Sequence, residues 1–140
     1  GHHVEPIGRA RVVRPGRDAT VVTYGAGVAW ATAAADRLAA EGVGDIEVID
    51  LRSLQPWDRE TVVESVKRTS RALVVHEAPV TGGFGAEVAS VIGHEAFMWL
   101  DAPVGRVGGL DTPIPFAPTL EESWSAEGRV EPALRELLAF

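Results

Sequence analysis

Short apolar runs rich in β-branched residues recur along the chain, and stretches with helical character separate them. The longer runs are Ala19 to Tyr24, Ile46 to Leu51 and Ala72 to Val75, and shorter extended candidates are Arg9 to Val13 and Val104 to Val107. Continuous apolar runs are typical of strands that are covered on both faces. Strands that alternate with helices predict right-handed crossovers and a mostly parallel sheet. The sequence therefore predicts a three-layer α/β/α sandwich.

The stretches between these runs carry the usual signals of helices. The alanine-rich stretch from Val28 to Glu41 has high helix propensity. A second helix is predicted to begin near Asp58, which is a good N-cap residue. The chain is predicted to close with a helix from about Val130 to Ala139. The segment from Gly108 to Pro118 is too rich in Gly and Pro for regular structure, so we expect a loop there.

The composition limits the kinds of partner and site. With 140 residues, 46% of them hydrophobic, the chain is long enough for one self-sufficient core. Its net charge of -7 argues against a surface for nucleic acid or for an anionic membrane. No stretch reaches the length of a membrane-spanning helix, and the lack of cysteine suits a reducing cytoplasm. We interpret residues 1–3, with His2 and His3, as a tag remnant, and assign residues 4–140 to one domain.

The run from His76 to Glu87 joins an apolar strand to a predicted helix through polar residues and glycines. A loop at the carboxyl end of a parallel strand is where open α/β sheets usually bind ligands, so His76 and Glu77 are candidate site residues. The two could form an acid–base pair, because histidine titrates near neutral pH. Adjacent residues of an extended chain point in opposite directions, however, so a shared site needs a bend here. The favoured interpretation is that both side chains only satisfy backbone groups.

The same run contains three glycines before the predicted helix, which are Gly82, Gly83 and Gly85. Backbone N–H groups at a helix start could cradle an anion. The segment Gly82-Gly83-Phe84-Gly85 lacks the Lys and the Ser or Thr of a phosphate-binding loop, so conformational freedom at a sharp turn explains the glycines better. Neither a metal-ligand spacing nor a nucleophile motif appears elsewhere. We therefore predict no metal site and no catalytic residue in this chain.

A nucleotide site is the alternative interpretation, and it would use Gly25, Gly27 and Asp50. The two glycines stand between a strand and a helix, and Asp50 ends the next strand, where a dinucleotide-binding fold has its ribose acid. The third glycine of that motif, which lets helix and strand approach, is replaced by the bulky Trp30. A tight strand-to-helix turn is therefore favoured, and a stand-alone nucleotide-binding module remains the alternative.

Six motifs follow one another along nearly the whole chain. They are Pro6-Ile7-Gly8-Arg9-Ala10, Val21-Val22-Thr23-Tyr24-Gly25, the stretch from Val48 to Asp58, the run from His76 to Glu87, Leu100-Asp101-Ala102-Pro103, and Asp111-Thr112-Pro113-Ile114-Pro115-Phe116. As an ordered set they resemble the C-terminal domain of the beta subunit of thiamine-diphosphate-dependent 2-oxo acid dehydrogenases, the E1 component. This resemblance implies the transketolase C-terminal fold, a five-stranded mixed sheet with one antiparallel strand between helix layers. Transketolases and 1-deoxyxylulose-phosphate synthases share that fold and are the alternative families.

The resemblance implies a part in an oxidoreductase of the bacterial cytoplasm. Such an enzyme converts pyruvate or a branched-chain 2-oxo acid and a lipoyl group to acyl-lipoyl and carbon dioxide. In this family the beta subunits form a heterotetramer with alpha subunits, and thiamine diphosphate and Mg²⁺ bind outside this domain. The family's catalytic residues also lie outside it. We therefore expect this chain alone to be inactive.

The resemblance also implies a role in assembly. In the family this domain contacts a second beta subunit and docks the subunit-binding domain of the E2 acyltransferase. Asp101 and the terminal carboxylate of Phe140 match the anionic contacts of that docking surface. An acidic domain that meets a basic partner agrees with the net charge of the chain. The pair His76 and Glu77 and the three glycines then become candidates for subunit contacts or loop structure.

Overall fold

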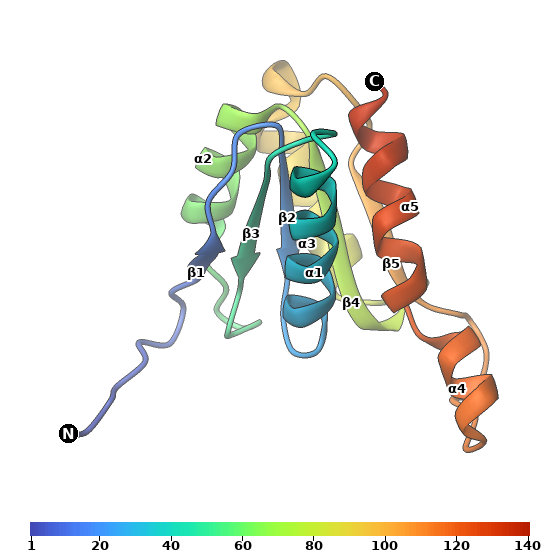
Figure 1. Cartoon of the computed structure of the whole chain (residues 1–140). Helices are drawn as coiled ribbons and strands as arrows, with labels where there is room; N and C mark the ends of the chain where they lie inside the picture. The colour runs from blue at the N-terminus through green and yellow to red at the C-terminus, as the bar shows by residue number, and fades with distance from the viewer.

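Five strands form one sheet in the order β1-β3-β2-β4-β5 in the computed structural model, which describes residues 1–140 (Figure 1). The strands are β1 (Arg11–Arg14), β2 (Ala19–Thr23), β3 (Ile46–Asp50), β4 (Ala72–Pro79) and β5 (Gly105–Gly109). β1 pairs antiparallel with β3, and the other three strand pairs are parallel. The predicted sheet with one antiparallel strand is confirmed.

Helices cover both faces of this sheet. They are α1 (Gly27–Ala40), α2 (Arg59–Thr69), α3 (Gly85–Glu95), α4 (Pro118–Trp124) and α5 (Glu127–Leu138), with a short 3₁₀ helix η1 (Phe97–Trp99) after α3. Figure 1 shows α1 and α5 in front of the sheet and α2 and α3 behind it, while α4 lies below its lower right edge. The three-layer α/β/α prediction is therefore confirmed. No helix is both long enough and apolar enough to cross a membrane.

Two hydrophobic cores fill the spaces between the layers. Val21 and Leu73 face the core under α1 and α5, whereas their neighbours Val22 and Val74 face the core under α2 and α3. Successive side chains of a strand point to opposite faces, so a central strand needs apolar residues at every position. This requirement explains the continuous apolar runs of the sequence.

Asp58 begins α2 as its N-cap, as predicted. Its carboxylate accepts hydrogen bonds from the backbone N–H of Thr61 at 3.2 Å and from the backbone N–H of Ala10 at 3.0 Å. Burial raises the pKa of Asp58, but these bonds and the one from the Thr61 hydroxyl outweigh burial and leave the pKa below its ordinary value. The N-cap therefore also fastens the segment before β1 to the second helix.

The main differences from the sequence prediction are two element boundaries and one additional helix. β4 continues to Pro79 and does not end at Val75, so part of the expected loop is strand. α5 begins at Glu127, before the expected start. The helix α4 was not predicted, because its first residue, Pro118, reads as a loop signal, although Pro is well tolerated at the first helical position.

Candidate functional site

His76 is enclosed in the protein interior, with 1% of its surface exposed. Its Nδ1 lies 2.8 Å from the backbone oxygen of Ala78, so the Nδ1–H donates to that carbonyl. β4 continues through this position, with an irregularity in its pairing to β5 between Val75 and Pro79, and the next side chain, Glu77, is exposed and makes no hydrogen bond to His76. The structure therefore does not bring the two side chains into one acid–base site. His76 instead fills the interior and satisfies a backbone group.

The glycines around His76 leave the space that its imidazole ring occupies. A Cβ on Gly85 would lie 2.5 Å from Nε2, and one on Gly83 would lie 2.7 Å from Cε1. Gly108 on β5 closes the third side, where a Cβ would lie 3.0 Å from Cε1. Gly82 has a different role, because its φ of +73° is a turn conformation that favours glycine. Close packing and a turn thus explain these glycines without a bound anion.

Aromatic rings gather between the carboxyl ends of β2 and β4. The chain turns to opposite sides of the sheet after these two neighbouring strands, which makes this place the topological switch point where open α/β sheets bind ligands. The ring of Tyr24 lies 6.0 Å from that of His76 and 6.5 Å from that of Phe84, and Trp57 lies 6.3 Å from Phe84, all measured between centroids. Side chains of this protein thus occupy the usual ligand position.

The alternative nucleotide site is not supported by the geometry around Gly25. The carboxylate of Glu77 lies so near that its Oε2 would be 3.4 Å from a Cβ on Gly25. Burial, and then the charge of Glu77, raise the pKa of Tyr24 beside it. The Asp50 carboxylate accepts a hydrogen bond from the backbone N–H of Arg52 at 3.0 Å. A carboxylate next to the first glycine would repel the phosphates of a dinucleotide.

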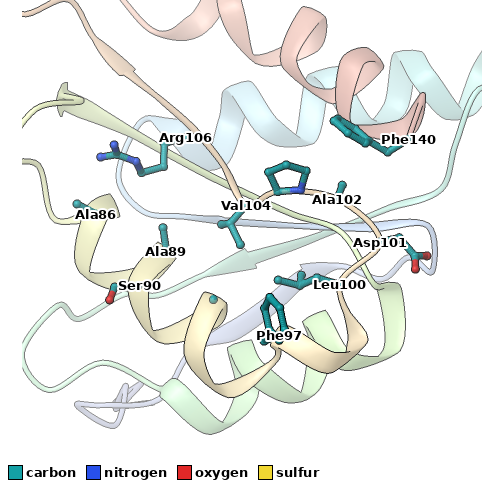
Figure 2. A pocket seen from close by; sticks show the side chains of 12 residues that line it. Ala86, Ala89, Ser90, Phe97, Leu100, Asp101, Ala102, Val104, Arg106 and Phe140 are labelled. Atoms are coloured by element: carbon teal, nitrogen blue, oxygen red, sulfur yellow. The ribbon is translucent and has the colours of Figure 1, made fainter.

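A groove with a volume of about 740 Å³ lies between α3 and the segment that leads into β5, the edge strand of the sheet (Figure 2). α3 borders one side of it with Ala86 and Ala89, and the opposite side is bordered by Phe140 after α5. Figure 2 shows Leu100 and Val104 in the middle of the groove. A smaller groove of about 240 Å³ lies on the α5 side of β5 and shares Pro103, Val104, Arg106 and Phe140 with the first. The free edge of the sheet thus offers an open, largely apolar surface.

The two docking candidates, Asp101 and Phe140, both line this groove. The backbone N–H of Asp101 donates to the oxygen of Ser70 at 2.8 Å, which fixes the residue beside the end of α2. The Asp101 side chain is 60% exposed, and its Oδ2 lies 3.8 Å from Nη1 of Arg71. Figure 2 shows Arg106 at the other end of the groove. Sequence reasoning missed both arginines, because neither stands in a motif.

Exposed apolar side chains continue the groove at η1. Phe97 lines the groove with 68% of its surface exposed, and Met98 beside it is 83% exposed. Trp99 is 47% exposed, and the Nζ of Lys67 lies 4.7 Å from the centroid of its ring. Contiguous exposed apolar residues with charged neighbours are typical of protein-binding surfaces.

The residues of this chain do not form a site that fits thiamine diphosphate and Mg²⁺. No group of three or more His, Asp or Glu side chains lies together where it could hold a metal ion. The buried histidine is enclosed by glycines and hydrogen-bonded to a backbone carbonyl, so it offers no open face to a cofactor.

The sequence of the chain matches a known protein family. The family described as "Transketolase, C-terminal domain" matches residues 8–127. The chain belongs to the transketolase C-terminal domain family. This transketolase C-terminal domain is 50% identical over 117 residues to the 2-oxoisovalerate dehydrogenase subunit beta of Pseudomonas aeruginosa, covering 84% of this chain and 32% of that protein. The pyruvate dehydrogenase E1 component subunit beta of Rhizobium meliloti is 45% identical over 119 residues, which are 85% of this chain and 26% of that protein.

Other relatives extend the match. The 2-oxoisovalerate dehydrogenase subunit beta of Bacillus subtilis is 41% identical over 140 residues, which are 99% of this chain and 42% of that protein. A solved structure of a split gene transketolase, described as an inactive beta4 tetramer, superimposes with a TM-score of 0.81 and 36% identity. That match covers 96% of this chain and 43% of the other chain. The chain thus spans between a quarter and less than half of the length of these relatives.

Proposed function

We propose that this chain is the C-terminal domain of the beta subunit of a 2-oxo acid dehydrogenase E1 component. The assembled enzyme would decarboxylate pyruvate or a branched-chain 2-oxo acid oxidatively and transfer the acyl group to a lipoyl group on E2. The support is that relatives at 41–50% identity are beta subunits of pyruvate and 2-oxoisovalerate dehydrogenases. Thiamine diphosphate and Mg²⁺ would bind outside this domain, in an alpha–beta heterotetramer. The lack of cysteine fits the bacterial cytoplasm as its location.

Within that enzyme, we propose that residues 4–140 form an assembly domain that docks the subunit-binding domain of E2. The observation that carries this proposal is that Asp101 and Phe140, far apart in the sequence, line the same groove at the free edge of the sheet. Apolar side chains there favour burial against a protein, and the exposed carboxylate favours a basic partner. The net charge of -7 would speed the encounter with such a partner.

Isothermal titration of the chain with an E2 subunit-binding domain tests the docking proposal. Replacing Asp101 by Asn removes the exposed charge and keeps the shape of the side chain. We expect an affinity about tenfold lower, as for loss of one partly solvated charge pair at an interface. Glu122→Gln is the matched control, because Glu122 is an exposed acid on α4 and does not line the groove. Equal affinities of both variants and wild type would contradict the docking role of Asp101.

We also propose that the opposite end of the sheet contacts a neighbouring subunit. Glu77 and Gly82 are exposed there and would form the contact, while His76, Gly83 and Gly85 hold that surface in place from inside. Glu77→Lys should lower the fraction of heterotetramer formed with the alpha subunit in analytical ultracentrifugation. A heterotetramer of unchanged stability would count against this contact.

A further inference from the structure

Arg71 forms an ion pair with the proposed docking acid Asp101. The distance from Nη1 to Oδ2 is 3.8 Å, which is too long for a hydrogen bond, so the contact is purely electrostatic. The Arg71 side chain is 22% exposed and the Asp101 side chain is 60% exposed. The arginine therefore lies on the protein side of the carboxylate, and the outer side of the carboxylate faces solvent.

The main chain holds both residues in place. The Arg71 carbonyl accepts from the backbone N–H of Thr20 at 2.8 Å and from the Thr69 hydroxyl at 3.2 Å, and the Asp101 N–H donates to Ser70. The Nε of Arg71 is buried and has no hydrogen-bond partner. A buried donor without a partner is costly, so no hydrogen bond at Nε stabilises this side-chain position. The backbone of Arg71 is thus fixed just before β4, and its guanidinium lies beside Asp101.

Resting on the docking function proposed above, we propose that Arg71 limits the affinity of the surface for its basic partner. Its charge offsets part of the charge of Asp101 and repels a cation that approaches the carboxylate from outside. A single lysine or arginine on an unrelated protein then gains little at Asp101. The partner must also fill the apolar groove between Phe97 and Phe140. Arg71 is thus a specificity-determining residue that makes docking depend on both contacts.

The test is titration of wild type and Arg71→Gln with the E2 subunit-binding domain at two salt concentrations. A partner cation at Asp101 would lie roughly 8 Å from the Arg71 charge, and at an effective dielectric constant near 40 its removal tightens binding about fivefold. This gain should appear at about 0.1 M salt, where the Debye length is about 10 Å, and largely disappear at about 1 M, where it is about 3 Å. A purely structural role of Arg71 would instead weaken binding at both concentrations.

Three further variants make the result decisive. Arg71→Lys keeps the charge and should bind like wild type, whereas Arg71→Met removes the charge with a well-packing side chain and should reproduce the tighter binding. Arg9→Gln is the matched control for net charge, because Arg9 is exposed and precedes β1 at the opposite edge of the sheet. Wild-type or weaker binding of both neutral Arg71 variants at about 0.1 M salt would overturn the inference and leave the docking proposal standing. No binding by wild type would overturn both.

Discussion

Gly85 is a position at which a single substitution would disturb the packing around His76. In Gly85→Ala the new Cβ would lie 2.5 Å from Nε2 and 2.7 Å from Cδ2 of His76, where ordinary contacts begin at 3.4 Å. The ring cannot retreat, because Gly83 and Gly108 lie against its other side and the Nδ1–H is bonded to Ala78. The methyl group must therefore displace the start of α3 from β4.

The expected cost follows from two opposing contributions. Overpacking of a closed site costs about 1–3 kcal/mol, and the enclosure of the ring from several sides points to the upper part of that range. Alanine gains up to about 1 kcal/mol over glycine in a helix, but Gly85 is the first residue of α3, where this gain is small. We expect a net loss of about 2 kcal/mol in the free energy of unfolding. For a domain of this size that lowers the melting temperature by about 7 °C.

Urea denaturation followed by circular dichroism measures this loss, and α3 itself supplies the control. Gly93 lies in the same helix, and a Cβ there meets nothing within 4 Å. Gly93→Ala should therefore be neutral or stabilising by up to about 1 kcal/mol. His76→Ser leaves space beside residue 85, so the double variant should recover at least about 1 kcal/mol relative to additivity. Equal stabilities of the two Ala variants, or strict additivity, would refute the account of these glycines.

Two further predictions concern titrating groups. Tyr24 is the one tyrosine of the chain, so an ultraviolet titration of the folded protein reports it directly, and Glu77→Gln should lower its raised pKa. A raised tyrosine pKa contributes stability that is present below the pKa of the unfolded chain. Wild type should therefore lose this stability as pH rises through the pKa of the folded protein. An unchanged Tyr24 pKa in the variant would exclude the charge of Glu77 as a cause. Asp58→Ala should cost about 1–2 kcal/mol at neutral pH, as for loss of an N-cap. Because the pKa of Asp58 is lowered on folding, its contribution to stability is present above the pKa of the unfolded chain and is lost as pH falls through the pKa of the folded protein. The free energies of unfolding of wild type and variant should therefore become equal in acid. A difference that stays constant with pH in urea denaturation would contradict this.

The sheet could be predicted from the sequence because its determinants are local. A strand covered on both faces needs an uninterrupted apolar run. The runs from Val21 to Val22 and from Leu73 to Val75 meet this need, with successive residues in the two cores. The N-cap at Asp58 is equally local, since the carboxylate reaches the N–H of Thr61 in the first helical turn. Both features depend on residues within a few positions of one another.

The sequence favours the interpretation that His76 satisfies a backbone group, but its burial could not be predicted, because burial depends on a distant segment. A run of His, Glu, Ala and Pro reads as a strand end, yet β4 continues through it. The imidazole is accommodated only because Gly108 on the neighbouring strand leaves room, and that pairing of β4 with β5 is not visible in either segment. In the same way, the sequence pattern alone does not place Phe140 and Asp101 in one groove, and only the family resemblance paired them, because their common groove depends on where α5 ends against the edge strand.

Side chains fill the topological switch point of this sheet, and this limits where the domain can bind other molecules. An open α/β sheet usually binds ligands between the strands whose connections diverge, and here the rings of Tyr24, His76 and Phe84 occupy that place. A fold that has closed its usual ligand position can still present surfaces, and its free edge at β5 lacks a neighbouring strand. The open groove and the exposed apolar residues of η1 lie at that edge. The geometry therefore favours binding to another protein at β5 over chemistry at the carboxyl ends of β2 and β4.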